Sequence, residues 1–260
     1  MNSNPSTLLR RRRAGTSQAE SKATSSDVVR AEPLYDQIYE ILWQKILRLE
    51  IVPGTPLRDL EWAKKLNVSR TPVREALRKM QKDGVLQGLN NGRYILKRIG
   101  SNELRALYRC RAALEALAIR DLSRVPPKEI AKLHALVDET VGYLEKRDTR
   151  SVFQLHTEFH ERLTSLTDNS YLLGLLENLR RLILYARASL RTVSDEGSEL
   201  GEMYVRQMER SQAHHASIMI SIAAQDFDGA ANQMEAHLFE TAEDMCAILD
   251  RATAVAGHAL

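Results

Sequence analysis

The chain has little of several features that would define other classes of protein. Its 260 residues include two cysteines, Cys110 and Cys246, which excludes a disulfide-rich scaffold and suits a reducing compartment. Aromatic residues make up 5%, which disfavours a β-sandwich and favours helices. No run approaches eighteen apolar residues, so we expect no membrane-spanning helix. The start of the chain lacks the apolar core of a signal peptide, and we do not expect export.

What the chain does have is a marked asymmetry of charge. The formal net charge is only +3, but residues 34–98 carry thirteen basic and seven acidic side chains. Residues 99–260 carry eighteen basic and twenty-four acidic side chains. The length and the 43% of hydrophobic residues predict two domains, each with a core of its own. The charge split predicts a basic module that meets a polyanion and an acidic module with another task.

The first 33 residues are rich in Ser, Thr, Ala and Arg and show no apolar periodicity. This composition predicts a disordered basic arm, with order beginning near Pro33. The four arginines at 10–13 leave two interpretations open, a solvated tail or non-specific contact with DNA phosphates.

Residues 34–98 have the pattern of three helices followed by a hairpin. The helices are expected near 34–49, 59–66 and 70–83, with a break at 52–56. Asn91-Gly92 lies between two short β-prone runs, 85–87 and 93–96, which is typical of a β-hairpin. Together these elements predict a winged helix-turn-helix domain.

The third of these helices separates an apolar face from a basic one. The apolar arc consists of Val73, Ala76, Leu77 and Met80. The neighbouring arc consists of Arg70, Thr71, Arg74 and Arg78. A solvated basic face is the alternative, but the hairpin and the local net charge of +6 favour DNA binding. Arginine suits that task because its planar fork reads guanine in the major groove and also grips phosphate.

The segment from Val68 to Leu77, VSRTPVREAL, resembles the signature of the GntR family of bacterial transcriptional regulators. The resemblance extends through IVPGTPL and DGVL on either side and covers about 34–98. It implies DNA contacts from the recognition helix by Ser69, Arg70, Thr71 and Arg74, and minor-groove contacts from the wing tip by Asn91 and Gly92. Arg78 joins this set by its place on the same helical arc. One departure is Leu60, where many members carry a basic residue.

The sequence pattern of the acidic segment, residues 99–260, predicts helices almost throughout. They are expected near 102–123, 128–147, 150–167, 170–192, 199–225 and 227–251. No part of it alternates with period two, so the whole protein is predicted to be mainly α. The segment is expected to form a single antiparallel bundle of six or seven helices over 102–251, followed by a flexible tail at 252–260.

Four of the seven histidines fall on or beside the apolar stripes of these helices. They are His156, His160, His215 and His237. Each neutral imidazole that faces a core needs a buried partner. A shared divalent metal would satisfy all four at once.

The helical segment resembles the effector-binding domain of the FadR-type branch of GntR regulators, called the FCD domain. The resemblance rests on motifs that agree in order and spacing: Arg111-x-x-Leu114-Glu115, His156-x-x-Phe159-His160 with Asn169, His215-x-x-Ile218 and Glu235-Ala236-His237-Leu238. It implies a metal held by one Asp or Asn and three His, with a small carboxylate effector at or beside it.

The sequence departs from that pattern at His156, where the family usually has Asp. An imidazole leaves the full +2 charge of the ion to be met by an anion or by water. Our hypothesis is a Zn- or Ni-like ion in a four-histidine site with open positions. Two alternatives stay open: three ligands with His156 lining the pocket, or no metal at all.

An arginine is the natural partner for an effector carboxylate, because its guanidinium fork matches the two oxygens. Arg111 is the first candidate, although it can also pair with Glu115 four residues on. Asn169 can reach the site or cap a helix. Arg181 and Arg187 on the helix predicted near 170–192 are further candidates.

These features predict a ligand-responsive, DNA-binding regulator that is cytoplasmic, bacterial and nucleoid-associated. A homodimer is expected, because two recognition helices related by a two-fold axis read a palindromic operator. A metal-free sensor of the same type is the alternative. An architectural DNA binder is disfavoured, because a large acidic bundle repels DNA.

A metalloenzyme is not expected. The string His156-Thr157-Glu158-Phe159-His160 lacks the His-Glu-x-x-His order, and Glu158 points away from His156. The chain also shows no nucleophile elbow and no phosphate loop.

Overall fold

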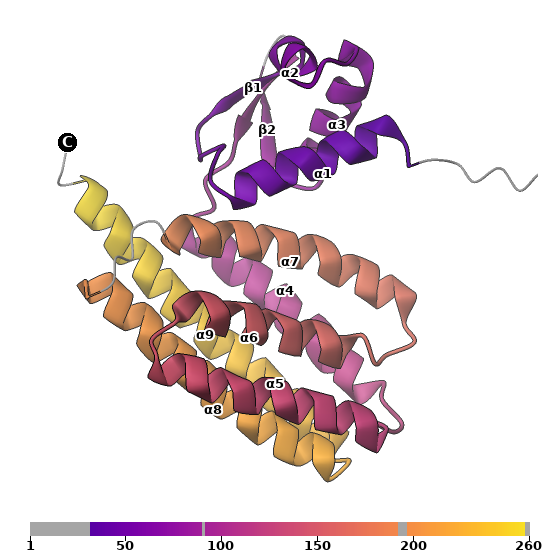
Figure 1. Cartoon of the computed structure of the whole chain (residues 1–260), viewed down its shortest axis with the longest axis vertical. Coiled ribbons are helices and arrows are strands. Elements are labelled where there is room, and N and C mark those ends of the chain that lie inside the picture. Colours follow the sequence, from indigo (N-terminus) through magenta and orange to yellow (C-terminus); the bar gives the residue numbers. More distant parts are fainter. Residues whose placement is uncertain (1–31, 90–91, 192–196, 258–260) are drawn as a thin grey trace, which may run out of the picture. The chain divides into compact units, whose positions relative to one another are not determined.

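The computed structural model describes residues 32–89, 92–191 and 197–257. Within these residues the protein is mainly α, with a small three-stranded sheet near the start and six longer helices after it (Figure 1). The predicted fold class is therefore confirmed. The predicted arm lies outside the described residues except for its last two positions, and Asn91 also lies outside them.

Three short helices build the first part of the described chain. They are α1 Leu34–Leu47, α2 Asp59–Leu66 and α3 Arg70–Lys82. The buried faces of α1 and α3 pack together, with Leu42, Trp43 and Leu77 almost fully excluded from solvent. Asn67 takes the left-handed conformation at φ 53°, so it caps α2 and sets the turn into α3. The helix-turn-helix geometry thus depends on a residue type that tolerates this conformation.

The wing is an antiparallel sheet with the strand order β1-β3-β2. Its strands are β1 Pro56–Arg58, β2 Leu86–Leu89 and β3 Arg93–Leu96. Tyr94 of β3 faces Leu57 on one side and Gly88 on the other. The predicted hairpin is confirmed, but β1 was not predicted, because its proline suggested a break. Pro56 is tolerated as the first residue of an edge strand, where its missing N–H breaks no ladder.

Six helices form the second part. They are α4 Ser101–Arg120, α5 Pro127–Glu145, α6 Thr149–Thr164, α7 Ser170–Arg191, α8 Glu199–Ala223 and α9 Phe227–Gly257. Each begins within one residue of its predicted start. The end of α9 differs, because 252–257 continue the helix instead of forming a flexible tail. Ala252 is 8% exposed, so burial extends the helix past the predicted end.

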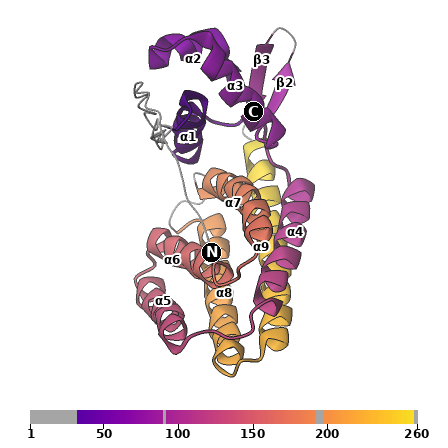
Figure 2. The same cartoon turned by 90° about the vertical axis from the view of Figure 1, so that its right-hand side faces the viewer.

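The core of the bundle lies where α9 packs along α4 and α8 (Figure 2). Leu104, Tyr108 and Met245 are fully buried there. Cys110 is exposed and Cys246 is buried, and both are free thiols. Among the described residues, no helix combines the length and the apolar character that crossing a membrane requires.

Candidate metal centre and DNA-facing surface

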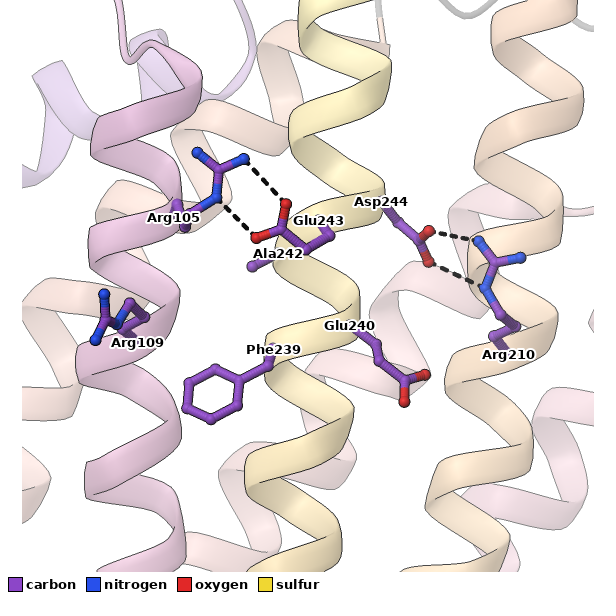
Figure 3. A pocket seen from close by; sticks show the side chains of 8 residues that line it. All are labelled: Arg105, Arg109, Arg210, Phe239, Glu240, Ala242, Glu243 and Asp244. Carbon is purple, nitrogen blue, oxygen red and sulfur yellow. Dashed lines mark hydrogen bonds and ion pairs between the residues drawn. The ribbon is translucent and has the colours of Figure 1, made fainter.

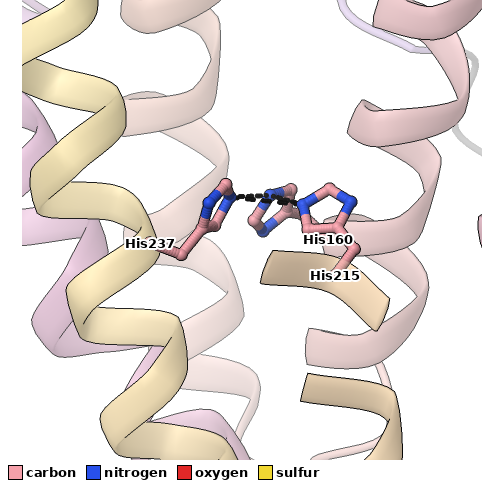
Figure 4. Close-up of side chains that lie close together, drawn as sticks. All are labelled: His160, His215 and His237. Carbon is pink, nitrogen blue, oxygen red and sulfur yellow. Dashed lines mark hydrogen bonds between the residues drawn. The ribbon is translucent and has the colours of Figure 1, made fainter. Parts of the chain in front are cut away.

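Three histidines from three helices converge inside the bundle (Figure 4). His160 comes from α6, His215 from α8 and His237 from α9, and each is at most 5% exposed. Their Nε2 atoms lie 3.1 Å apart for His160–His215, 3.2 Å for His215–His237 and 3.3 Å for His160–His237. We call these three residues the histidine cluster.

The spacing of the histidine cluster fits a tetrahedrally coordinated ion. Zn–N bonds of about 2.0–2.1 Å place neighbouring ligand nitrogens roughly 3.3 Å apart, close to the observed spacing. Burial, followed by the neighbouring histidines, lowers the pKa of His215 and of His237 well below the usual imidazole range. Neutral imidazoles are the form that binds a metal. The residues present therefore fit a divalent transition metal.

A buried carboxylate orients one of the three rings. Glu115 of α4 is fully buried, and its Oε2 lies 2.7 Å from the Nδ1 of His160. The Arg111 Nε donates to Glu115 Oε1 at 2.7 Å, and an Arg180 Nη2 lies 3.9 Å from the same oxygen. Burial opposes ionisation, but Arg111, His160 and Arg180 hold the pKa of Glu115 at about 2. The ionised Glu115 accepts the proton of Nδ1, which leaves the Nε2 lone pair facing the cluster.

The link from Glu115 to His160 was not predicted from the sequence. Arg111 and Glu115 are four residues apart on one helix, so their pairing was among the expected alternatives. Glu115 and His160 are 45 residues apart on different helices. Arg180, which donates to the backbone oxygen of His160 at 3.2 Å, is also a newly found member of this network.

The predicted fourth ligand, His156, lies beside the cluster without joining it. Its ring centroid is 4.7 Å from that of His215, and its Nε2 has no hydrogen-bond partner among the described residues. The three ligand atoms that lie within 4.8 Å of one another come from His160, His215 and His237. Burial and then the charge of Arg187 lower the pKa of His156 to about 3, so this ring is neutral too.

The histidines line a small buried pocket together with two of the predicted effector-binding arginines. Arg111 and Arg187 lie in its wall, and each is 7% exposed. The cavity measures about 20 Å³, and a single water needs about 10–15 Å³. In this conformation the pocket therefore has room for an ion-sized guest.

The structure does not bring the other two predicted effector residues to this pocket. The Oδ1 of Asn169 accepts from the backbone N–H of Leu172 at 3.1 Å, so Asn169 caps α7. Arg181 donates to Glu40 at 2.6 Å and to Glu177 at 2.9 Å.

A larger hollow of about 580 Å³ lies on the surface of α4, α8 and α9 (Figure 3). Its walls hold two ion pairs, Arg105 with Glu243 at 2.7 Å and Arg210 with Asp244 at 2.6 Å. None of the predicted site residues lies in it. Two of its three arginines, Arg105 and Arg210, are already paired with carboxylates.

The predicted DNA-contacting side chains of α3 lie on its solvent side. Ser69, Arg70, Thr71, Arg74 and Arg78 are all exposed, as is Gly92 of the wing. Arg70 also contacts the nearly buried Asp59 through two bonds of 3.0 and 3.1 Å, which ties the start of α3 to α2. Arg78 pairs with Glu75 at 3.1 Å. The buried apolar arc that was predicted lies beside this basic arc on α3.

Fold and sequence place this architecture among known transcriptional regulators. Residues 34–93 match the pattern of the gntR family of bacterial regulatory proteins, and residues 106–240 match the FCD domain. The HTH-type transcriptional repressor RspR of Escherichia coli (strain K12) is 30% identical over 216 residues, 82% of this chain and 90% of that protein. The uncharacterized HTH-type transcriptional regulator YdhC of Bacillus subtilis (strain 168) is 26% identical over 220 residues, 84% of this chain and 93% of that protein.

A solved structure, E. coli McbR/YncC, shares the fold with a TM-score of 0.61 at 22% identity, covering 85% of this chain and 99% of that one. The chain is thus a DNA-binding transcriptional regulator rather than an enzyme. It belongs to the GntR family and carries an FCD domain.

Proposed function

We propose that this regulator is controlled by a small organic acid that binds beside a metal in the histidine cluster. The observation that carries the proposal is the convergence of three Nε2 atoms within 3.3 Å in one buried pocket. Zinc and nickel are the preferred candidates, because neutral imidazoles suit both. When bound, the ion supplies a positive centre for an anion, and Arg111 and Arg187 add guanidinium groups in the same wall.

His156 supports the proposal as an available fourth nitrogen. A buried polar atom without a partner is costly, and its Nε2 is such an atom. A ring rotation toward the ion would satisfy it. Because an imidazole carries no charge, a site with His156 keeps more of the ion's attraction for an acid than a site with Asp.

For DNA, we propose that α3 lies in the major groove and the wing at the adjacent minor groove. Arg74 and Arg78 are exposed on the face that would meet the bases, and Arg70 is anchored by Asp59. Ser69 and Thr71 would approach the backbone at the start of the helix, as would Asn91 and Gly92 from the wing.

We further propose a homodimer that reads a palindromic operator. An exposed apolar patch on α4 and α7 supports it, since Tyr171 is 88% exposed and Leu175 and Leu117 are also exposed. The helices that carry these residues pack together through Ala118 and Leu172. Exposed apolar patches of this kind mark interaction surfaces.

Native mass spectrometry of the full chain tests the metal and the dimer together. We expect a dimer with about one metal per chain, and His237→Ala is expected to lose the metal. The matched control is His134→Ala, which removes a partly exposed histidine of α5 that does not line the pocket. Purified protein that stays free of metal after zinc or nickel is added would contradict the metal proposal.

The dimer surface has its own test. Tyr171→Ser combined with Leu175→Ser is expected to shift the dimer toward monomer. Ile220→Ser, which also removes an exposed apolar side chain but from α8, is expected to leave the dimer unchanged. Equal behaviour of the two variants would place the interface elsewhere.

DNA binding is tested by selection from a random duplex library, followed by fluorescence anisotropy on the selected site. We expect an inverted repeat with half-sites about one helical turn apart. Adding a carboxylate to the metal-loaded protein is expected to change the DNA Kd by at least about fivefold, in the range of ordinary allosteric coupling. A DNA Kd that neither a carboxylate nor a chelator changes would contradict control by an acid.

A further inference from the structure

The charges around the histidine pocket are unevenly compensated. Arg111 and Arg180 both face the ionised Glu115, so their charges are partly balanced inside the bundle. Arg187 has no carboxylate partner among the described residues. Its Nη2 lies 3.4 Å from the hydroxyl of Tyr204, the hydroxyl of Tyr108 is a second neutral neighbour, and its Nε has no hydrogen-bond partner in the described part of the chain.

A buried, unpaired guanidinium is costly unless something anionic meets it. Arg187 is 7% exposed, and arginine stays protonated in proteins. Its guanidinium carbon lies 4.5 Å from the centre of the Phe153 ring, which gives cation–π contact but no charge compensation. Arg187 therefore offers a second positive centre in the pocket, separate from the histidine cluster.

Arg187 and the histidine cluster contact different parts of α6. Phe153, over which Arg187 lies, and His160 are seven residues apart on α6, which places them on nearly the same face and about 10 Å apart along the axis. His156 lies between them, and the pocket wall includes His156, His160 and Arg187. A carboxylate that binds at the histidine cluster leaves the charge of Arg187 for a second anionic group.

We propose that the effector carries two acidic groups, one directed to the histidine cluster and the other to Arg187. This inference rests on the proposed control by an acid and narrows it to a class, a short dicarboxylate or an acid with an equivalent second anionic group. Arg187 is the residue that sets this preference, because the charge of Arg111 is already partly balanced by Glu115.

The small volume of the cavity determines how the preference for a dicarboxylate has to be measured. At about 20 Å³ the pocket has to open for any such acid, and opening lowers the affinity of every guest. A monocarboxylate and a dicarboxylate of equal chain length share most of this cost. The ratio of their affinities therefore reports mainly on the second acidic group.

The test is isothermal titration calorimetry on the zinc-loaded full-length protein with two matched pairs, butyrate with succinate and pentanoate with glutarate. We expect the dicarboxylate of at least one pair to bind about tenfold more tightly or better. In Arg187→Met that advantage should fall to within about twofold, while the monocarboxylate affinity stays nearly unchanged. Arg206→Met, which removes an exposed arginine of α8, is the control and should keep the advantage.

The outcomes separate the two proposals. Equal affinity of the matched acids for the unmodified protein overturns the two-acid inference and leaves control by a carboxylate standing. An advantage that survives in Arg187→Met overturns the role of Arg187. If no acid of either kind binds although zinc is bound stoichiometrically, control by a carboxylate fails as well. The affinity ratio of the unmodified protein decides the inference even if Arg187→Met does not fold.

Discussion

Arginine serves the two parts of this protein in opposite environments. On α3 the side chains of Arg70, Arg74 and Arg78 are 61%, 48% and 57% exposed. In the bundle Arg111 and Arg187 are each 7% exposed. DNA is too large to enter a protein, so the groups that read it must stand in solvent. A small acid gives up its own hydration only for charges that are already shielded from water, where their attraction is stronger.

The role of the exposed arginines of α3 is tested most strongly by the substitution Arg74→Ala. A base contact contributes about 1–3 kcal/mol, and a dimer presents the residue twice, so we expect operator affinity to fall by about 2–6 kcal/mol. Fluorescence anisotropy on the selected operator measures this loss. Lys128→Ala removes an exposed cation from α5 and is expected to change the affinity little. A comparable loss in both variants would mean that general charge, not the α3 face, binds DNA.

The buried network around the histidine cluster is tested most directly by a substitution at Glu115. Glu115→Gln keeps the shape but removes the charge that orients His160, and such outer groups typically contribute 10–100-fold to metal affinity. We expect a loss of that size in a competition titration with a chromophoric chelator. Glu243→Gln, which removes an acid that pairs with exposed Arg105, should leave metal affinity within about twofold. An unchanged affinity in Glu115→Gln would show that His160 needs no buried partner.

His156 tests how far the metal centre extends. If its nitrogen completes the centre, His156→Ala lowers metal affinity by at least about tenfold, because losing a ligand costs no less than losing an outer group. His156→Asp should restore the affinity while weakening the binding of acids, because the carboxylate cancels one unit of the ion's charge. The same chelator competition and calorimetry measure both effects. Full affinity in His156→Ala would restrict the centre to three histidines.

The smallest expected effect concerns a residue that belongs to neither binding site. Asn169→Ala removes the side chain that caps α7, which is expected to cost about 1 kcal/mol of unfolding free energy. Urea denaturation followed by circular dichroism measures it. The affinity for acids is expected to stay unchanged, and a selective loss of that affinity would return Asn169 to the effector site.

Local signals in the sequence predicted the helices well. The bounds of α2 agree at both ends with the prediction, and α7 differs by one residue. These helices could be predicted because apolar periodicity marks their length and Pro, Gly and Asn mark the breaks between segments. Strand β1 was missed because a three-residue strand owes its existence to pairing with β3, about forty residues later. Such pairing leaves no local pattern.

At the candidate site, too, local features could be predicted from the sequence and long-range contacts could not. The inward faces of His160, His215 and His237 could be predicted from helical periodicity, since each lies beside an apolar stripe. Which nitrogens meet, and that His156 stays aside, depend on how helices α6, α8 and α9 are rotated against one another. The contrast between a paired Arg111 and an unpaired Arg187 likewise depends on Glu115 being fully buried between helices.

The histidine cluster has a further consequence for the mechanics of the bundle. His160 and His237 are 77 residues apart, and the cysteines of this chain form no disulfide. An ion held by the cluster would act as a removable cross-link that closes this long loop and pins α6 to α8 and α9. A ligand that binds only the folded state stabilises it, and this stabilisation grows with the logarithm of the ligand concentration above its Kd. The cellular supply of the metal would then tune the stiffness of the sensor before any effector arrives.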